Sequence, residues 1–168
     1  MEKKEASGTA VVTQVAVVVR DLEAAMRAYH RTFGWGPWRI YDLREPLHHD
    51  TSVRGEPVRY SMRTAVTRVG GLDFELVEPL EGPSPYKEFL EEKGERLHHI
   101  MCQAADGQDF DVAARLAECG LPELMSGAVG DEATYAYHDG TGDDLKVIVE
   151  TMVGRGRVAP SGVFTPDD

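Results

Sequence analysis

The hydrophobic pattern of the chain predicts strands and helices in a recurring order. A β-branched run at 11–19 is typical of a buried strand, and Gln14 interrupts it. Asp21 is placed to cap a following helix and Gly34 to end it. Between them, apolar positions recur at helical spacing and predict one buried helix face: Leu22, Met26, Tyr29 and Phe33.

Three strands complete this first round. Gly70-Gly71 predicts a hairpin between the last two of them, and the strands are expected at 38–43, 58–69 and 72–78. The polar stretch 44–56 is predicted as a loop, with His48 and His49 facing solvent. Trp35 and Trp38 are expected in the core or in the wall of a cleft.

The same order of elements begins again after a linker rich in Pro and Gly. A short helix is predicted over 84–93, with Ser84 as its cap and Pro85 in its first turn. A strand at 97–103 and a helix at 109–119 follow, and the helix is expected to face inward with Phe110, Ala113, Leu116 and Ala117. The remaining strands are predicted at 123–129, 134–138 and 145–152, with His138 on the surface of the turn that follows the second of them.

This order predicts an α+β chain of two tandem βαβββ modules. The expected organisation is a flexible leader, a first module, a linker with a short helix, a second module and a loosely attached tail: 1–10, 11–80, 81–96, 97–153 and 154–168. Two related modules that face each other would bring equivalent positions to one cleft.

Four polar side chains interrupt the apolar strands at matching positions of the two modules. Gln14 and His99 lie in the first strand of each module, and Glu75 and Glu150 lie in the last. A carboxylate in a buried strand is costly unless it is paired or coordinated, and a divalent metal ion satisfies a histidine and two glutamates together. We therefore expect a metal site. Two alternatives stay open: the Gln14 amide satisfies backbone groups, or Gln14 and Glu75 bind substrate without a metal.

Composition excludes several classes of function. The formal net charge of −11, from 18 basic and 29 acidic residues, argues against nucleic-acid binding, which needs a basic face. No apolar run approaches the ~20 residues of a membrane helix, and the N-terminus has no signal-peptide core. Cys102 and Cys119 follow no metal or redox spacing, so a cytoplasmic protein with free thiols is expected.

Several motifs together resemble the vicinal oxygen chelate superfamily, which includes glyoxalase I, methylmalonyl-CoA epimerase, extradiol dioxygenases and antibiotic-resistance proteins. The motifs are residues 12–22, Phe33-Gly34-Trp35, 74–80, 97–100 and Val149-Glu150, and the resemblance spans residues 11–153. The stretch from Val77 to Ile100 is most similar to methylmalonyl-CoA epimerase. The resemblance implies a glyoxalase-like half-barrel cleft, a homodimer, and a small-molecule substrate that is an acyl-CoA thioester or an α-oxo compound.

The metal positions of that superfamily fall on Gln14, Glu75, His99 and Glu150. Epimerases usually have a histidine at the first position, whereas some zinc-type glyoxalases I use Gln, Glu, His and Glu in this order. Oxygen and nitrogen ligands without thiolate suit zinc, cobalt, nickel, manganese or magnesium. Epimerases also carry a further catalytic glutamate early in the third strand of the first module, and Glu56 is the nearest candidate here.

The chemistry that this resemblance implies is abstraction of a proton α to a carbonyl, by a metal-dependent isomerase, epimerase or lyase. Glu150 is the first choice for the base, before Glu75, because the apolar residues Val147, Ile148 and Val149 precede it and exclude water. His98 is expected to point away from the site and to be structural.

Two other functions are carried forward. The first is a metal-free drug-binding protein of the resistance type, which would hold an aromatic ligand between Trp35, Trp38, Tyr60 and Tyr137. The second is an extradiol dioxygenase, which needs two histidines and a carboxylate on iron. It is less favoured because Gln14 replaces one of those histidines.

Overall fold

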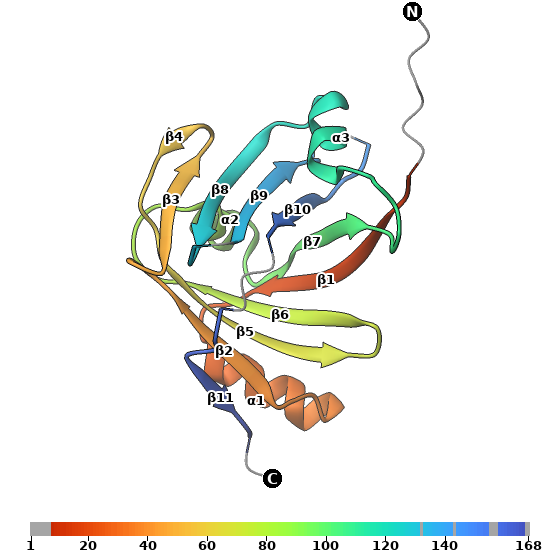
Figure 1. Cartoon of the computed structure of the whole chain (residues 1–168). Helices are drawn as coiled ribbons and strands as arrows, with labels where there is room; N and C mark the ends of the chain where they lie inside the picture. Colours follow the sequence, from red (N-terminus) through yellow and green to blue (C-terminus); the bar gives the residue numbers. More distant parts are fainter. Residues whose placement is uncertain (1–7, 132, 143, 155–157, 167–168) are drawn as a thin grey trace, which may run out of the picture.

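A computed structural model of the chain describes residues 8–131, 133–142, 144–154 and 158–166. Over these residues the fold is α+β, with three helices and one 11-stranded mixed sheet (Figure 1). The first half contributes β1 (Ala10–Val18), α1 (Leu22–Phe33), β2 (Trp38–Leu43), β3 (His48–Val53), β4 (Glu56–Pro57), β5 (Met62–Val69) and β6 (Leu72–Pro79). The second half contributes α2 (Pro85–Lys93), β7 (Arg96–Ala104), α3 (Val112–Glu118), β8 (Glu123–Val129), β9 (Ala133–Asp139), β10 (Ile148–Val153) and β11 (Gly162–Phe164).

The sheet contains the predicted repeat. Its strand order is β11-β2-β5-β6-β1-β7-β10-β9-β8-β3-β4. In each half the first strand pairs in parallel with the last, β1 with β6 and β7 with β10. The antiparallel pair β1 and β7 joins the two halves within one chain, and Figure 1 shows the halves inclined towards each other. The predicted α+β class with two βαβββ units is confirmed.

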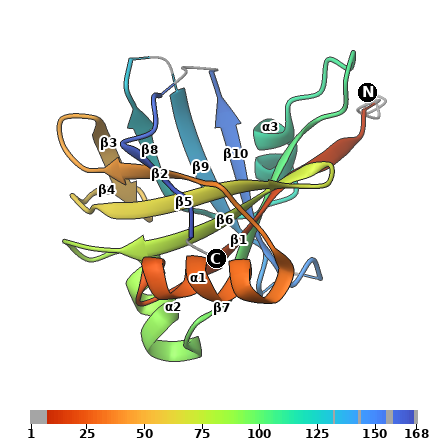
Figure 2. The same cartoon turned by 90° about the horizontal axis from the view of Figure 1, so that it is seen from below.

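Helix α1 forms where the sequence predicts it. The Asp21 carboxylate accepts a hydrogen bond from the backbone N–H of Ala24, and Gly34 ends the helix with φ 71°, a left-handed conformation that glycine adopts without steric cost. The helix buries Leu22 and Met26 against the outer face of the first half of the sheet, where the apolar cluster also contains Trp38, Ala65, Phe74 and Leu76. Figure 2 shows the helix on one side of β2, β5 and β6.

The polar stretch 44–56 is not a loop, and this prediction was wrong. Most of it forms β3 and β4, and β3 pairs with β8 at the far edge of the second half. His48 is 1% exposed, with Nδ1 3.2 Å from the carbonyl oxygen of Tyr60 and Nε2 2.7 Å from the hydroxyl of Tyr135. Of the two histidines, only His49 is partly exposed. The next strand is also shorter than predicted, since β5 begins at Met62 rather than at residue 58.

The second half departs from the prediction in two places. Helix α3 begins after Asp111, because the carboxylate of this residue accepts a hydrogen bond from the backbone N–H of Ala114. None of the α3 residues is fully buried; of the residues predicted to face inward, Phe110, Ala113 and Leu116 are half-buried and Ala117 is exposed. His138 was predicted on a turn surface, but β9 extends through it and its side chain is 6% exposed.

The C-terminal segment is attached to the first half. Strand β11 pairs antiparallel with β2, and the guanidinium carbon of Arg27 lies 4.9 Å from the ring centroid of Phe164. The predicted loose tail is therefore wrong for residues 158–166, and the first seven residues of the predicted leader lie outside the described residues.

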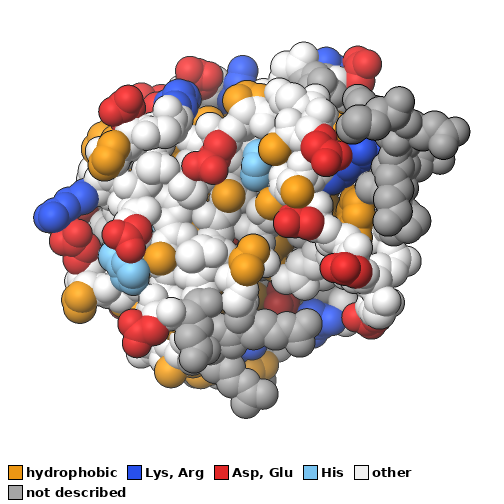
Figure 3. Space-filling view, turned by 45° about the horizontal axis from the view of Figure 1, so that its top comes forward, with side chains coloured by type: hydrophobic (Ala, Val, Ile, Leu, Met, Phe, Trp, Pro, Cys, Tyr) orange, Lys and Arg blue, Asp and Glu red, His pale blue; other side chains and the backbone are white. Residues whose placement is uncertain are grey.

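The molecular surface agrees with the charge balance of the sequence. Basic side chains are dispersed over the face shown in Figure 3 and do not gather into a patch. Among the described residues, no helix combines the length and apolar character needed to cross a membrane.

The buried position of His48 predicts how stability depends on pH. Burial lowers the pKa of His48, and the hydrogen bond to the Tyr60 carbonyl opposes this only in part. Below about pH 6.5 the unfolded chain therefore takes up a proton that folded His48 does not, so the free energy of unfolding falls as the pH falls. His48→Gln should reduce this dependence between pH 7 and pH 5 in urea titrations.

His49→Gln is the matched control, because hydrogen bonds to Gly130 and Asp50 raise the pKa of His49 and reverse the sign of its contribution. An unchanged pH dependence in His48→Gln would contradict the assignment of His48 as a buried neutral side chain.

Candidate metal centre

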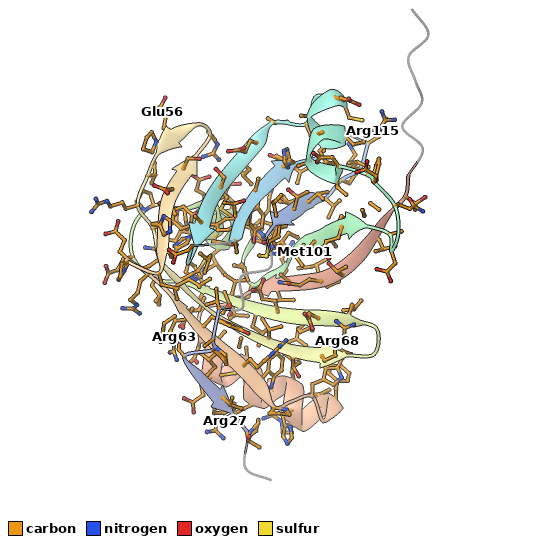
Figure 4. The ribbon with its side chains drawn as sticks, viewed as in Figure 1. Arg27, Glu56, Arg63, Arg68, Met101 and Arg115 are labelled. Atoms are coloured by element: carbon orange, nitrogen blue, oxygen red, sulfur yellow. The ribbon has the colours of Figure 1, made fainter. Side chains whose placement is uncertain are left out.

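Strand register brings the four predicted ligand residues onto one face of the sheet. Ala16 lies opposite Glu75 in β6 on one side and opposite His99 in β7 on the other. In the next row of the same face, Gln14 lies opposite Met101, and Met101 lies opposite Glu150 in β10. The four central strands of the sheet therefore contribute one residue each, close to the position of Met101 in Figure 4.

The side chains of these residues lie within ion-pair or hydrogen-bond distance of one another. Nε2 of His99 lies 3.1 Å from Oε2 of Glu150 and 3.6 Å from Oε2 of Glu75. The Gln14 amide donates to Oε2 of Glu75 over 2.6 Å. One ligand atom each from Glu75, His99 and Glu150 lies within 4.8 Å of the other two. The structure thus brings together all four predicted residues, and their role as ligands stays a prediction.

The cluster is buried and strongly polarised. His99 is 0% exposed, Glu150 4%, and Gln14 and Glu75 9% each. Burial raises the pKa of Glu75, and the negative charge of Glu150 adds to this effect. Burial alone disfavours a charged His99, but its contacts with Glu150 and Glu75 outweigh that cost and raise the pKa of His99 to about 9. The site therefore favours positive charge between its two carboxylates.

The donor set fits a divalent metal ion. Oε2 of Glu150 is buried and has no hydrogen-bond partner, since its contact with His99 lacks hydrogen-bond geometry. An unsatisfied buried carboxylate oxygen is costly, and coordination to an ion would remove that cost. Turning the Gln14 amide by 180° would present its oxygen beside Glu75. One imidazole, two carboxylates and one amide oxygen suit the same ions as before: zinc, cobalt, nickel, manganese or magnesium.

The family model described as the glyoxalase/bleomycin resistance protein/dioxygenase superfamily matches residues 13–137. The chain belongs to this superfamily. The resemblance drawn from the sequence motifs is thereby confirmed. No curated protein matches the chain.

Several solved structures are similar to this chain over nearly its whole length. A hypothetical protein from Bacillus halodurans C-125 has a TM-score of 0.59 at 18% identity, over 89% of this chain and 98% of that one. Methylmalonyl-CoA epimerase from Mycobacterium tuberculosis has a TM-score of 0.54 at 19% identity, over 94% and 95%. A variant of Streptomyces coelicolor methylmalonyl-CoA epimerase in complex with 2-nitronate-propionyl-CoA has 0.52 at 22%, over 89% and 100%. At these identities the similarity establishes the fold.

His98 has a closer relation to the site than the sequence suggested. It was predicted to be structural and to point away, and it is indeed packed, at 4% exposure, between Tyr86 and Phe89. However, its Nδ1 lies 2.9 Å from Nδ1 of His99. Burial lowers the pKa of His98 well below its usual value, so the ring is neutral and one of the two nitrogens donates to the other.

This contact is compatible with the tautomer of His99 that a metal ligand requires. When the Nδ1–H of His99 donates to Nδ1 of His98, the lone pair of His99 Nε2 faces Glu75 and Glu150, as a metal ligand requires. A register shift in the β1 and β7 pair after Ala16 lies beside this point. Strict strand alternation would place neighbouring side chains on opposite faces, so the sequence pattern alone did not indicate the contact.

Tyr137 is a second residue that sequence reasoning did not assign to the metal centre. Its hydroxyl lies 3.4 Å from Nε2 of His99 and accepts a hydrogen bond from the Tyr86 hydroxyl over 2.7 Å. The available signal was the alternation of Tyr135 and Tyr137 in one strand, which predicts two aromatic side chains on the same face.

Other predicted residues do not reach the cluster. Glu56 is exposed in β4, at the end of the β3–β4 hairpin and away from Met101 (Figure 4), so it is not a second base in this structure. Trp35 and Trp38 pack with α1 on the opposite face of the sheet. Cavities of about 350 and 410 Å³ lie beside α3, lined in part by Ala113, Thr151 and Val153, and neither includes a ligand candidate.

The His98 contact leads to a test. His98→Phe keeps a ring between Tyr86 and Phe89 but removes the acceptor that orients His99, so affinity for Co²⁺ should fall by about 10- to 100-fold. Stability without metal should be maintained, because Nε2 of His98 is itself buried without a partner. Calorimetric titration of Co²⁺ and urea unfolding measure the two effects.

His138→Phe is the control, since His138 is also a buried histidine with an unpartnered ring nitrogen, but lies outside the cluster. Equal Co²⁺ affinity in His98→Phe and the parent would show that His98 does not orient His99.

Proposed function

We propose that this superfamily member is a metal-dependent enzyme that removes a proton α to a carbonyl, as an epimerase, isomerase or lyase. Its substrate would be an acyl-CoA thioester or an α-oxo compound. The observation that carries the proposal is the buried cluster of Glu75, His99 and Glu150, in which one carboxylate oxygen has no hydrogen-bond partner. Solved structures of the same fold include a methylmalonyl-CoA epimerase in complex with methylmalonyl-CoA, which supports the thioester class.

Four residues would hold the ion, and one of them, Glu150, would also accept the proton. Gln14, Glu75, His99 and Glu150 would hold the ion, which when bound would polarise the substrate carbonyl and acidify the α-proton. Glu150 is the better proton acceptor, because its Oε2 is free of hydrogen bonds, whereas Oε2 of Glu75 already accepts one from Gln14.

The alternatives have less support. A drug-binding site between Trp35, Trp38, Tyr60 and Tyr137 would need all four rings on one face, but both tryptophans pack with α1 on the other. Extradiol dioxygenase chemistry uses two histidines and a carboxylate, whereas the cluster among the described residues contains a single histidine.

The first test of the proposal concerns the metal. Protein purified without chelator should contain about one divalent ion per chain, because the cluster offers one set of ligands. His99→Ala should lose most of that ion, because the substitution removes the one imidazole ligand. The variant should still fold. Metal analysis by mass spectrometry measures the content, with circular dichroism to verify folding.

His49→Ala is the control for histidine replacement, because His49 lies outside the cluster. Full metal content in His99→Ala would exclude the proposed centre.

The second test concerns the reaction. In deuterated water, the metal-loaded protein should label the α-carbon of either 2-methyl-branched acyl-CoA esters or α-oxo hemithioacetals. Glu150→Gln removes the proton acceptor and should slow labelling by about 10²- to 10⁴-fold, the usual contribution of a general base. Mass spectrometry of the recovered substrate measures the labelling.

Glu78→Gln should exchange at the parent rate, because Glu78 lies in the same strand as Glu75 but outside the cluster. A metal-loaded parent that labels neither substrate class would refute the proposed reaction.

A further inference from the structure

We propose that Tyr137 is a catalytic hydrogen-bond donor to the substrate oxygen that gains negative charge as the α-proton leaves. This inference rests on the proposed function and assigns a residue to it. It begins from position: the β9 and β10 register places Tyr137 directly opposite Glu150, and its side chain is 2% exposed. The Tyr137 ring stands edge-on to the His99 imidazole, with centroids 4.7 Å apart.

The direction of the hydrogen bonds decides where the Tyr137 proton can go. The Tyr86 hydroxyl donates to the Tyr137 oxygen, so this oxygen already acts as an acceptor. Tyr86 is 1% exposed and packs against the rings of His98 and Tyr137, which holds its hydroxyl in place. The other contact of the Tyr137 hydroxyl is Nε2 of His99, at 3.4 Å, which can accept the Tyr137 proton only when that nitrogen is deprotonated.

Metal binding would remove that acceptor. His99 Nε2 has one lone pair, and it cannot both coordinate an ion and accept a hydrogen bond from Tyr137. The phenolic O–H would then lie beside the cluster without its former partner, so it could donate to a substrate oxygen bound there. An O–H donor that is already fixed in a buried site stabilises developing charge strongly, because it does not have to reorganise.

The proton and electron balance is complete with residues of this chain. The α C–H bond breaks, its proton goes to a Glu150 oxygen, and the electron pair of the bond moves towards the carbonyl oxygen. Tyr137 shares its own proton with that oxygen and keeps it. Return of this proton to the α-carbon restores the starting state of Glu150, and deuterium enters the α-carbon when the Glu150 proton has first exchanged with deuterated water.

Tyr135 provides a matched control in the same strand and on the same face. It is also buried, but its hydroxyl is engaged with His48 Nε2 at 2.7 Å and with the Tyr60 hydroxyl at 2.6 Å. These partners lie outside the candidate ligand set, so metal binding leaves this hydrogen-bond network intact. Removal of the Tyr135 hydroxyl therefore tests the general effect of removing a buried phenol.

The experiment compares Tyr137→Phe, Tyr135→Phe and the parent, each folded by circular dichroism and loaded with Co²⁺. Tyr137→Phe should bind Co²⁺ within a few-fold of the parent and leave KM nearly unchanged. Its rate of α-deuterium exchange should fall by about 10²- to 10³-fold, the usual effect of removing one such donor. Its calorimetric affinity for an anionic acyl-CoA nitronate should fall by about ten-fold or more, while affinity for the neutral thioether analogue stays the same.

Tyr135→Phe should match the parent in all of these measurements. Tyr86→Phe, which frees the Tyr137 oxygen but keeps its proton, should give an intermediate loss of exchange. If the parent exchanges and Tyr137→Phe exchanges equally fast, the role of Tyr137 is refuted and the proposed function stands. If Tyr137→Phe loses Co²⁺ as His99→Ala does, Tyr137 supports the ligands instead. If the parent itself exchanges nothing, the proposed function fails.

Discussion

The attraction between one buried imidazole and two buried carboxylates governs the centre of this protein. Glu75, His99 and Glu150 come from three different strands of the sheet, and each is almost completely removed from water. A buried charge without a partner destabilises a fold by several kcal/mol, on the order of 3–5 for a broken pair. The central strands therefore have to keep a register that holds these groups together. The same closeness of two carboxylates and one imidazole suits the binding of a divalent cation.

Aromatic and polar side chains support this cluster from two sides. On one side, α2 supplies Tyr86 and Phe89, which enclose His98 and so hold its contact with His99. On the other, Tyr137 approaches His99 from β9. Because these hydroxyls and ring nitrogens are buried, each needs a defined partner, and a group left without one is a point where substrate or metal can bind.

The two halves of the sheet are similar in topology but differ in how they are covered and closed. Helix α1 buries apolar side chains against the first half, whereas α3 buries none against the second. The two halves also contribute edge strands to each other. Strand β3 of the first half pairs with β8, and β11 of the second half pairs with β2. Figure 1 shows both pairings. Each half of the sheet is therefore extended by a strand that belongs to the other half of the sequence.

The sequence by itself determined the features that depend on neighbouring residues. Asp21 and Gly34 set the ends of α1, Gly70 marks the β5–β6 hairpin, and the repeated strand pattern placed Gln14, Glu75, His99 and Glu150 in equivalent positions. Caps, turns and periodicity act within a few residues, so they can be predicted without the fold.

Tertiary structure alone decided the rest. His48 is buried because Tyr135, 87 residues away, bonds to it, and β3 is a strand because β8 pairs with it. Likewise, His98 contacts His99 beside an irregularity in the pairing of β1 with β7, and pairing across β9 and β10 brings Tyr137 to the site. Such contacts depend on which strands become neighbours, and a polar stretch carries no local pattern that identifies its distant partner.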